Sequence, residues 1–239
     1  MSRNIQKELP GLVTVVTVHY QTPELLRKTV ESFQRWYPSI PYLVFDNGSS
    51  PDSEKVLLEI EMPGLSEWGQ SAEGGAEGHA EVHVHREPSN IFHGPALDKA
   101  VREMVFTPYV FFLDSDTETQ TPGFLEQAIE QLEKDPSMYA AGRQIRVNRR
   151  GFKDPDGFPI LLTPYLLLKT DLYRQFSPFI HHGQPGLKHF YEAQQTGYRL
   201  IDFPMHDYID HLWRGTASKF GYRLGLRGKW DFLMNKLGW

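Results

Sequence analysis

The sequence predicts an α/β fold in which helices flank a mostly parallel, twisted sheet. Apolar, β-branched runs typical of strands alternate with helical patterns along the first half of the chain. The 239 residues, 40% of them hydrophobic and 23% charged, are enough to bury a substantial core. A formal net charge of -5 gives no global positive field, so no nucleic acid partner is expected. The absence of cysteine excludes disulfides and thiol chemistry.

The first four elements follow from apolar patterning. A strand is predicted at Leu12–Val18, because this run is almost wholly apolar, as in strands covered on both faces. A helix follows from Pro23, with Thr22 in the N-cap position. The next pair is a strand at Tyr42–Phe45, ended by a dense turn signal, and a helix at Asp52–Ile60.

The remaining elements are predicted by the same criteria. The most apolar strand candidate is Tyr109–Leu113. Further strands are expected at Glu81–His85, Ala140–Val147 and Leu161–Leu168, and helices at Pro95–Met104 and from Thr121 to about Asp135. Residues 1–218 are expected to form one domain, interrupted by a mobile, acidic and glycine-rich surface loop at about 62–80 and followed by a basic, aromatic tail at 219–239.

Two aspartates follow the strand at Tyr109–Leu113 directly. Alternate residues of an extended segment point the same way, so Asp114 and Asp116 are predicted to face one cleft. Ligands of open α/β sheets bind at the carboxyl ends of the strands. Two hard oxygen ligands there suit Mg²⁺ or Mn²⁺, which would hold phosphate oxygens. The alternative is a solvated Asp-Ser-Asp turn that caps the next helix.

Asp46 ends the second predicted strand and precedes a glycine-bearing turn. A carboxylate in this place can accept a hydrogen bond from a base or a ribose, and its neighbours offer backbone N–H groups to phosphate. The alternative is an Asx-turn satisfied by its own backbone.

Four ordered segments resemble the family 2 glycosyltransferases of GT-A fold. They read VTVVTVHYQTPELLRKTVESF, VFDNGSS, NIFHGPALDKAV and YVFFLDSDTETQTPGFLEQAIEQL. The likeness covers residues 12–135 well and the remainder loosely. It implies a GT-A-type fold, as in the nucleotide-diphospho-sugar transferases. It also implies transfer of a sugar from a nucleoside-diphosphate sugar, most commonly a UDP-sugar, to an acceptor hydroxyl, with inversion at the anomeric carbon.

The resemblance also implies roles for residues of the first half. Asp46 would contact the nucleobase, and the chain from Thr17 to Tyr20 would line the nucleotide pocket. Asp114 would face the ribose or the water shell of the metal. Asp116, in the Asp-x-Asp (DXD) motif, would bind Mn²⁺ or Mg²⁺ directly.

Two residues near the end of the chain extend this implied site. His211 resembles a late histidine that family members add to the metal shell, and a neutral imidazole is a suitable ligand. Arg214 would then neutralise the diphosphate. The metal would stabilise negative charge on the departing nucleoside diphosphate.

The family's usual carboxylate base has no counterpart in this sequence. The element GYR is present at 197–199, but the stretch from position 181 reads HHGQPG, without the expected Glu-Asp pair. Imidazole titrates near neutral pH, so His182 or His181 is predicted to deprotonate the acceptor. Three alternatives stay open. Glu192 or Asp171 could reach the site. His181 and His182 could instead form an exposed polar turn before a helix that begins near Pro185, or the protein binds a nucleotide sugar and transfers nothing, or transfers by another route.

Other enzyme classes fit less well. In haloacid-dehalogenase-like phosphatases the Asp-x-Asp motif lies near the chain start and is followed by Thr or Val where Glu118 stands here. A sugar-nucleotide synthesising nucleotidyltransferase carries a glycine-rich phosphate loop after its first strand, where this chain reads HYQTP.

The ends of the chain bear on location. Met1 to Pro10 is polar, so a cytoplasmic protein without a secretory signal is expected. Lys219 to Trp239 interleaves basic and aromatic residues, which suits peripheral contact with the inner face of a membrane and a lipid-linked acceptor. The alternative is a terminal helix whose aromatic side chains pack on the domain.

Overall fold

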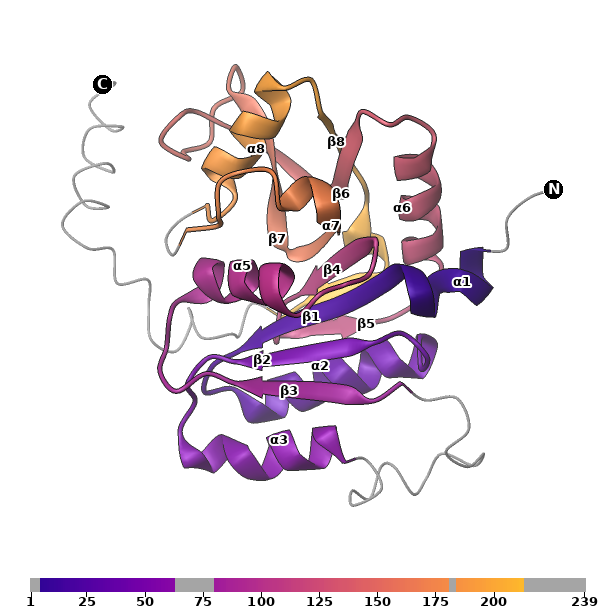
Figure 1. Ribbon diagram of the computed structural model, residues 1–239, viewed down its shortest axis with the longest axis vertical. Helices are drawn as coiled ribbons and strands as arrows, with labels where there is room; N and C mark the ends of the chain where they lie inside the picture. The colour runs from indigo at the N-terminus through magenta and orange to yellow at the C-terminus, as the bar shows by residue number, and fades with distance from the viewer. Residues whose placement is uncertain (1–4, 63–79, 181–183, 213–239) are drawn as a thin grey trace.

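The structure is a computed structural model that describes residues 5–62, 80–180 and 184–212. Within these residues the main sheet has seven strands: β1 (Val13–His19), β2 (Tyr42–Asp46), β3 (Val82–Arg86), β4 (Tyr109–Leu113), β6 (Met138–Val147), β7 (Phe158–Lys169) and β8 (Arg199–Asp202). Their order in space is β3-β2-β1-β4-β7-β6-β8 (Figure 1).

The strands β1 to β4 run parallel to one another, so their carboxyl ends lie at one edge of the sheet. β7 is antiparallel to both β4 and β6, whereas β8 is parallel to β6. Leu113, the last residue of β4, pairs with Tyr165 of β7. The part of β7 that precedes Tyr165 therefore extends past the end of β4, on the side of the sheet where ligands of α/β proteins bind.

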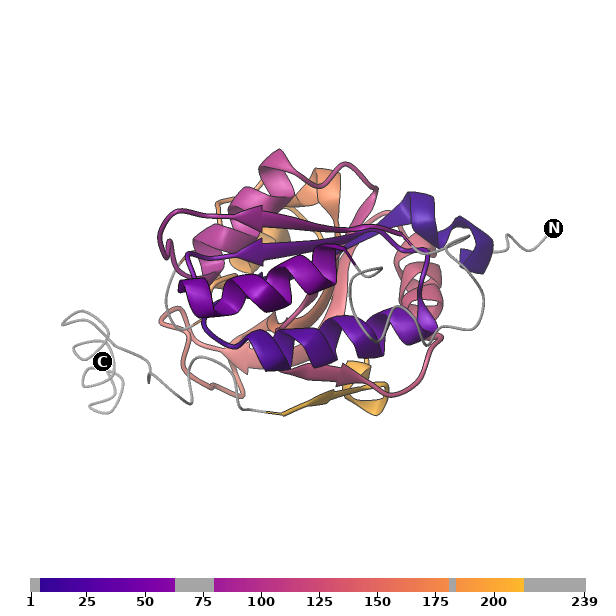
Figure 2. The ribbon, with the colours of Figure 1, turned by 90° about the horizontal axis from the view of Figure 1, so that it is seen from below.

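A second, two-stranded ladder lies beside the main sheet. It joins β5 (Thr117–Thr119) to β9 (Ile209–His211) in antiparallel register, with Thr117 opposite His211. Figure 2 shows this ladder along α2 (Pro23–Trp36), with which β5 makes direct contact. The ladder brings a late segment of the chain to the end of β4.

Helices cover both faces of the main sheet (Figure 1). On one face, apolar residues of α1 (Ile5–Leu12), α2, α3 (Glu54–Glu61) and α6 (Phe124–Glu133) share a core with the strands. The opposite core includes residues of α5 (His93–Glu103), α7 (Thr170–Tyr173) and α8 (Leu187–Gln195). Two short 3₁₀ turns, η1 (Pro51–Ser53) and η3 (Met205–Asp207), complete the described elements.

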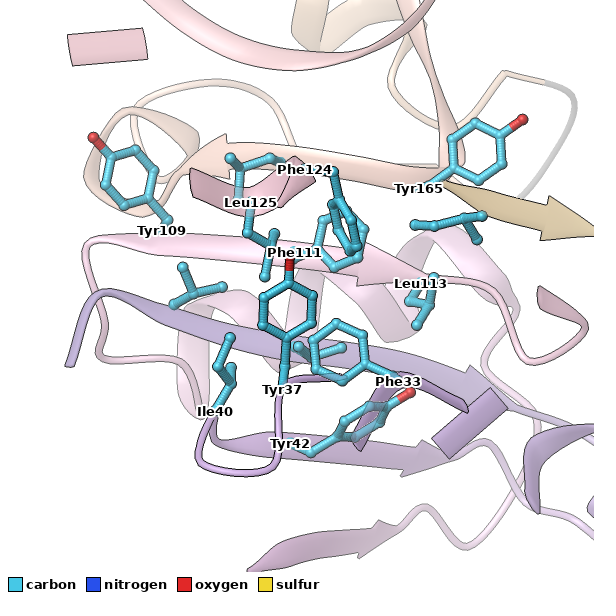
Figure 3. Packing of buried hydrophobic residues seen from close by; sticks show 14 of the residues in the cluster. Phe33, Tyr37, Ile40, Tyr42, Tyr109, Phe111, Leu113, Phe124, Leu125 and Tyr165 are labelled. Atoms are coloured by element: carbon cyan, nitrogen blue, oxygen red, sulfur yellow. The ribbon is translucent and has the colours of Figure 1, made fainter. Parts of the chain in front are cut away.

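Aromatic side chains fill the core beneath α2 and α6 (Figure 3). The Phe33 ring lies 5.6 Å from that of Tyr42, edge to face, and the Phe111 ring lies 5.5 Å from that of Phe124. Phe33, Phe111 and Phe124 are fully buried. Each such side chain contributes about 1.5–3 kcal/mol by leaving water. This core fixes the positions of β1, β2 and β4 and thereby of the residues that follow them.

Most predicted elements are confirmed with small shifts of their ends. The helix expected from Thr121 begins at Phe124, because Gly123 adopts a left-handed backbone with φ of 97° before it. α1, β5, α7, β8 and β9 were not predicted. The loop predicted at about 62–80 lies almost wholly outside the described residues, and the tail at 219–239 lies entirely outside them. No described helix is long and apolar enough to cross a membrane.

Candidate active site

Two carboxylates and one imidazole lie together just beyond the end of β4. The potential ligand atoms of Asp114, Asp116 and His211 all lie within 4.8 Å of one another. His211 Nε2 is 3.1 Å from Asp116 Oδ1 and 3.9 Å from Asp114 Oδ2. The side chains of Asp116 and His211 are only 7% and 8% exposed, whereas that of Asp114 is 25% exposed. The structure thus brings together the three residues predicted to bind metal, with one side open to solvent.

The two aspartates approach each other through a turn and not, as predicted, as alternate residues of an extended strand. β4 ends at Leu113. Beyond it, the Asp114 backbone N–H donates to the Pro164 carbonyl at 2.9 Å. The Thr117 hydroxyl donates to the Asp114 carbonyl at 2.8 Å and closes the turn. The turn forms because β7 continues past β4 and supplies a partner for the backbone there.

The ladder of β5 and β9 positions His211 beside Asp116. Besides the strand pairing, the Leu212 backbone N–H donates to the Asp116 carbonyl at 2.9 Å. Helix α2 holds β5 from the other side. The Thr29 hydroxyl donates to the Thr117 carbonyl at 2.8 Å and accepts from its N–H at 3.3 Å. Thr29 and Thr117 are fully buried, so these bonds form away from water.

The electrostatics of the cluster suit a cation. Burial raises the pKa of the Asp114 carboxyl above its usual value; nearby His93 and His211 oppose this rise, and the charge of Asp116 adds to it. The donor set consists of two carboxylates, the oxygen ligands that both Mn²⁺ and Mg²⁺ prefer, and one imidazole, a nitrogen ligand that suits a transition metal better than Mg²⁺. A divalent ion would also relieve the repulsion between the two carboxylates.

His93 is a site residue that the sequence analysis did not single out. It is the first residue of α5, and its Nε2 lies 3.7 Å from Asp114 Oδ1. Its side chain is 36% exposed. The only signal in the sequence was its place in NIFHGPALDKAV, one of the four segments that carry the family resemblance. The pairing of β1 with β4 and the packing of α5 on β1 bring it to Asp114.

Asp46 is buried at the end of β2 and bonded to protein groups. Its Oδ1 accepts a hydrogen bond from His19 Nδ1 at 2.8 Å, and its Oδ2 accepts one from the Ser49 N–H at 3.2 Å. Because His19 Nε2 accepts the Thr22 N–H at 3.0 Å, Nδ1 carries the imidazole proton. Burial alone would raise the pKa of Asp46, but the bonds from His19 and Ser49 outweigh it and lower that pKa.

The turn after Asp46 is held against the segment that follows β3. Asn47 Oδ1 accepts the Ile91 N–H at 2.9 Å, and Asn47 Nδ2 donates to Asn90 Oδ1 at 3.1 Å. Gly48 has φ of 71°, and a Cβ there would lie 2.5 Å from the Ser89 carbonyl carbon. This close approach of two backbones requires glycine.

The other predicted nucleotide-pocket residues take different positions. The Thr17 hydroxyl is fully buried and bonded to the Tyr42 hydroxyl at 2.7 Å, so this side chain belongs to the core. Tyr20 is half-buried in the turn after β1. Gln21 follows it with an unusual positive φ of 59° and accepts a hydrogen bond from the Ser50 hydroxyl at 2.8 Å. Such strain in a non-glycine residue is found most often at functional sites.

The predicted bases His181 and His182, and also Arg214, lie outside the described residues. Of the two alternative carboxylates, Asp171 is wrongly placed for the site. It follows Lys169, which pairs with Tyr109 at the start of β4, about 13 Å from the end of that strand. The Glu192 carboxylate is bonded to Ser177: its two oxygens accept hydrogen bonds from the Ser177 N–H at 2.8 Å and from the Ser177 hydroxyl at 2.7 Å.

Comparison with known proteins gives one family and many similar folds. A sequence model of glycosyl transferase family 2 matches residues 14–193. Comparison with curated protein sequences gives no match. Among solved structures, the mannosyltransferase PcManGT from Pyrobaculum calidifontis, in complex with GDP-Man and Mn²⁺, is similar at a TM-score of 0.59 and 18% identity, over 79% of this chain and 53% of that one.

Two further structures show the same fold. GalNAc-T7, with UDP, GalNAc and Mn²⁺, matches at a TM-score of 0.59 and 14% identity, over 79% of this chain and 41% of that one. Residues 1–349 of S. aureus TarS match at a TM-score of 0.53 and 14% identity, over 79% of this chain and 57% of that one. These likenesses confirm the predicted GT-A-type fold. This chain spans about half the length of the structures that it resembles.

Proposed function

Because this chain belongs to glycosyl transferase family 2, we propose that it transfers a sugar from a nucleoside-diphosphate sugar to an acceptor hydroxyl. The observation that carries the proposal is the cluster of Asp114, Asp116 and His211 at the carboxyl edge of the sheet. The fold supports it as well, since PcManGT and GalNAc-T7 were both determined with Mn²⁺ and a nucleotide or nucleotide sugar.

Asp116 and His211 would hold a Mn²⁺ or Mg²⁺ ion, with Asp114 completing the site or facing the donor ribose. Such an ion stabilises negative charge on a departing diphosphate. Asp116 is the better-fixed carboxylate, because β9 and α2 anchor the residues around it. To accept a cation, His211 must present Nε2 as a lone pair and so give up the contact with Asp116.

The carboxyl ends of β1 and β2 would hold the nucleotide. Asp46 is the proposed contact for the base, and the turn at residues 47–49 lies beside it. We propose a UDP-sugar as donor, which is the common choice in the family. Arg214 is proposed to neutralise the diphosphate.

The proposed reaction is a displacement at the anomeric carbon. The acceptor hydroxyl gives its proton to a base and its oxygen bonds to that carbon, while the bond to the diphosphate oxygen breaks. His182, or its neighbour His181, is the proposed base. Its support is chemical, because imidazole titrates near neutral pH. Attack from the face opposite the leaving group would invert the configuration.

The direct test is release of nucleoside diphosphate from UDP-sugars and GDP-sugars in the presence of Mn²⁺. The Asp116→Ala variant is expected to lose at least about a hundredfold in rate. The matched control is Asp210→Ala, which removes an exposed carboxylate beside His211 and should leave the rate within twofold. Equal rates in wild type and Asp116→Ala would contradict the proposal.

A second variant tests the base. His182→Gln should lose transfer and keep metal-dependent nucleotide binding, whereas loss of both properties would mean a role in binding or folding. If wild type binds a nucleotide sugar yet neither hydrolyses nor transfers it with any acceptor, the chain is a nucleotide-sugar binding protein. The missing carboxylate base is the feature that favours this second reading.

A further inference from the structure

A strongly basic hairpin joins β6 to β7 in a chain that is acidic as a whole. Residues 143–153 carry five positive side chains and no carboxylate, although the full sequence has 25 Lys and Arg against 30 Asp and Glu. We call this segment the basic hairpin. Its cations are Arg143, Arg146, Arg149, Arg150 and Lys153, all of them exposed. Two aspartates, Asp154 and Asp156, follow it in the turn before β7.

The basic hairpin projects from the same edge of the sheet as the metal-ligand cluster. Gly142 pairs with Leu166, which in turn pairs with Phe112 of β4. The residues after Gly142 therefore run past the end of β4, in the direction of Asp114. β6 continues outward to Val147, which pairs with Phe158.

A second set of contacts links the tip of the hairpin to the site. Gly151 lies at the tip of the hairpin. A Cβ added to it would lie 3.4 Å from the Gln184 side chain and 3.5 Å from that of Leu187, so the tip packs on the start of α8. Near the start of α8, the Ile180 backbone N–H donates to the Pro185 carbonyl at 3.1 Å, and the Ile180 carbonyl lies directly against Gly94. Gly94 follows His93, whose imidazole faces Asp114. The hairpin thus borders the side of the site away from β2 and the proposed nucleotide pocket.

Four of the five cations of the hairpin form no ion pair within the part of the chain that the structure describes. In the described ranges, no carboxylate lies within ion-pair distance of Arg143, Arg146, Arg149 or Lys153. Arg146 donates to the Gly157 carbonyl at 2.5 Å, and Arg149 lies over the Tyr191 ring at 5.7 Å. Both contacts hold the side chains in place without neutralising their charge.

A shallow hollow lies between two of these cations. Ile145, Arg146, Lys153, Asp154 and Pro155 line about 280 Å³ of open space. Asp154 contributes a carboxylate to this hollow, but its Oδ1 already accepts the Asp156 N–H at 3.0 Å. The surface of the hollow itself is mainly apolar, so the positive charge that a ligand would meet here comes from the exposed cations of the hairpin around it.

We propose that the acceptor of this enzyme carries phosphate, which the basic hairpin binds while the acceptor hydroxyl enters the site. This inference rests on the proposed function. Four of the five cations are arginines, whose planar guanidinium matches phosphate oxygens with two parallel hydrogen bonds. A membrane surface fits less well, because no large hydrophobic side chain of the hairpin is exposed to enter a bilayer.

The test compares two triple variants of equal charge. Arg143→Gln, Arg150→Gln and Lys153→Gln remove three charges from the hairpin. Lys7→Gln, Lys28→Gln and Lys55→Gln remove three exposed charges from α1, α2 and α3 and serve as control. Binding of soluble inorganic polyphosphate is measured by calorimetry in EDTA, so that no metal recruits the probe to the aspartates. Co-sedimentation with phosphatidylglycerol vesicles is measured in parallel.

The hairpin variant should bind polyphosphate at least about tenfold more weakly than wild type, and the control within twofold. Equal binding in all three proteins, or binding to vesicles without binding to soluble polyphosphate, would overturn the proposal. Stabilisation by UDP or GDP with Mn²⁺ should be the same in all three. If UDP and GDP stabilise none of the three proteins, the proposed function fails. If the hairpin-dependent binding of polyphosphate persists in that case, the hairpin is still an anion-binding surface.

Discussion

Gly48 shows how a single residue fixes the proposed nucleotide pocket. Its φ of 71° and the 2.5 Å approach of a Cβ to Ser89 mean that Gly48→Ala combines backbone strain with a clash against main chain. We expect a loss of about 2–4 kcal/mol in the free energy of unfolding, measured by urea denaturation.

Gly197 provides the matched control for this substitution. It also has a positive φ, 92°, but a Cβ there meets nothing within 4 Å. Gly197→Ala should therefore cost only the backbone term, about 1 kcal/mol. Equal losses at the two positions would show that the contact between the turn of Gly48 and Ser89 is not as tight as the structure has it.

Part of the candidate site could be predicted from single residues. Asp114 and Asp116 stand out because they follow the most apolar strand of the chain, and His211 because of its family resemblance. His93 carries no comparable signal, since one histidine at the start of a helix says nothing about what faces it. The hydrogen bond between His19 and Asp46 could not be predicted from the sequence either, because only the pairing of β1 with β2 brings the two residues together.

At the scale of elements, α2 is the support of the metal-ligand cluster. Thr29→Val removes the hydroxyl that satisfies both backbone groups of Thr117 and should cost about 1–3 kcal/mol, because those groups stay buried. It should also weaken Mn²⁺ binding, as Asp116 precedes Thr117. Urea denaturation and calorimetric Mn²⁺ titration check the two effects.

Thr196→Val is the control for this effect. It removes a hydroxyl that also donates to a backbone carbonyl, that of Ala193 at 2.8 Å, but at the exposed end of α8. We expect a change within about 0.5 kcal/mol and unchanged Mn²⁺ affinity. Unaltered Mn²⁺ affinity in Thr29→Val would mean that β5 holds Asp116 without help from α2.

The elements that escaped prediction share a physical reason. β5 and β9 have three residues each and pair across about 90 positions of sequence, so neither shows a periodic pattern of its own. α1 is short, buries only Ile5 and Leu9 and contains Pro10, so its sequence shows no helical pattern of apolar residues. Long apolar strands such as β1 and β4 were found because burial on both faces leaves a continuous run.

For the molecule as a whole, the burial of His189 predicts that the fold loses stability in acid. It is fully buried among aromatic side chains, with Nδ1 donating to the Ser177 carbonyl at 2.8 Å and Nε2 accepting from the Tyr139 hydroxyl. Burial lowers its pKa from 6.5 to about 4. The unfolded chain therefore binds a proton more readily, and this contribution to stability is complete above pH 6.5 and is lost as the pH falls towards 4.

The expected loss is about 3 kcal/mol across this interval. Urea denaturation between pH 4 and 8 measures it. His189→Gln should flatten the pH dependence whatever its stability at pH 8, and His206→Gln, at an exposed position, should leave it unchanged. An unchanged slope in His189→Gln would assign the acid sensitivity to other groups.

The central claim is that Asp114, Asp116 and His211 hold a divalent ion that in turn binds a nucleoside diphosphate. Thermal unfolding against UDP, GDP and dTDP, each with and without Mn²⁺, tests it most directly, because a ligand that binds only the native state raises the midpoint. We predict stabilisation by one diphosphate, only with Mn²⁺, and its loss in Asp116→Ala. A folded wild type that no nucleotide stabilises, or a shift that persists in Asp116→Ala, would contradict the claim.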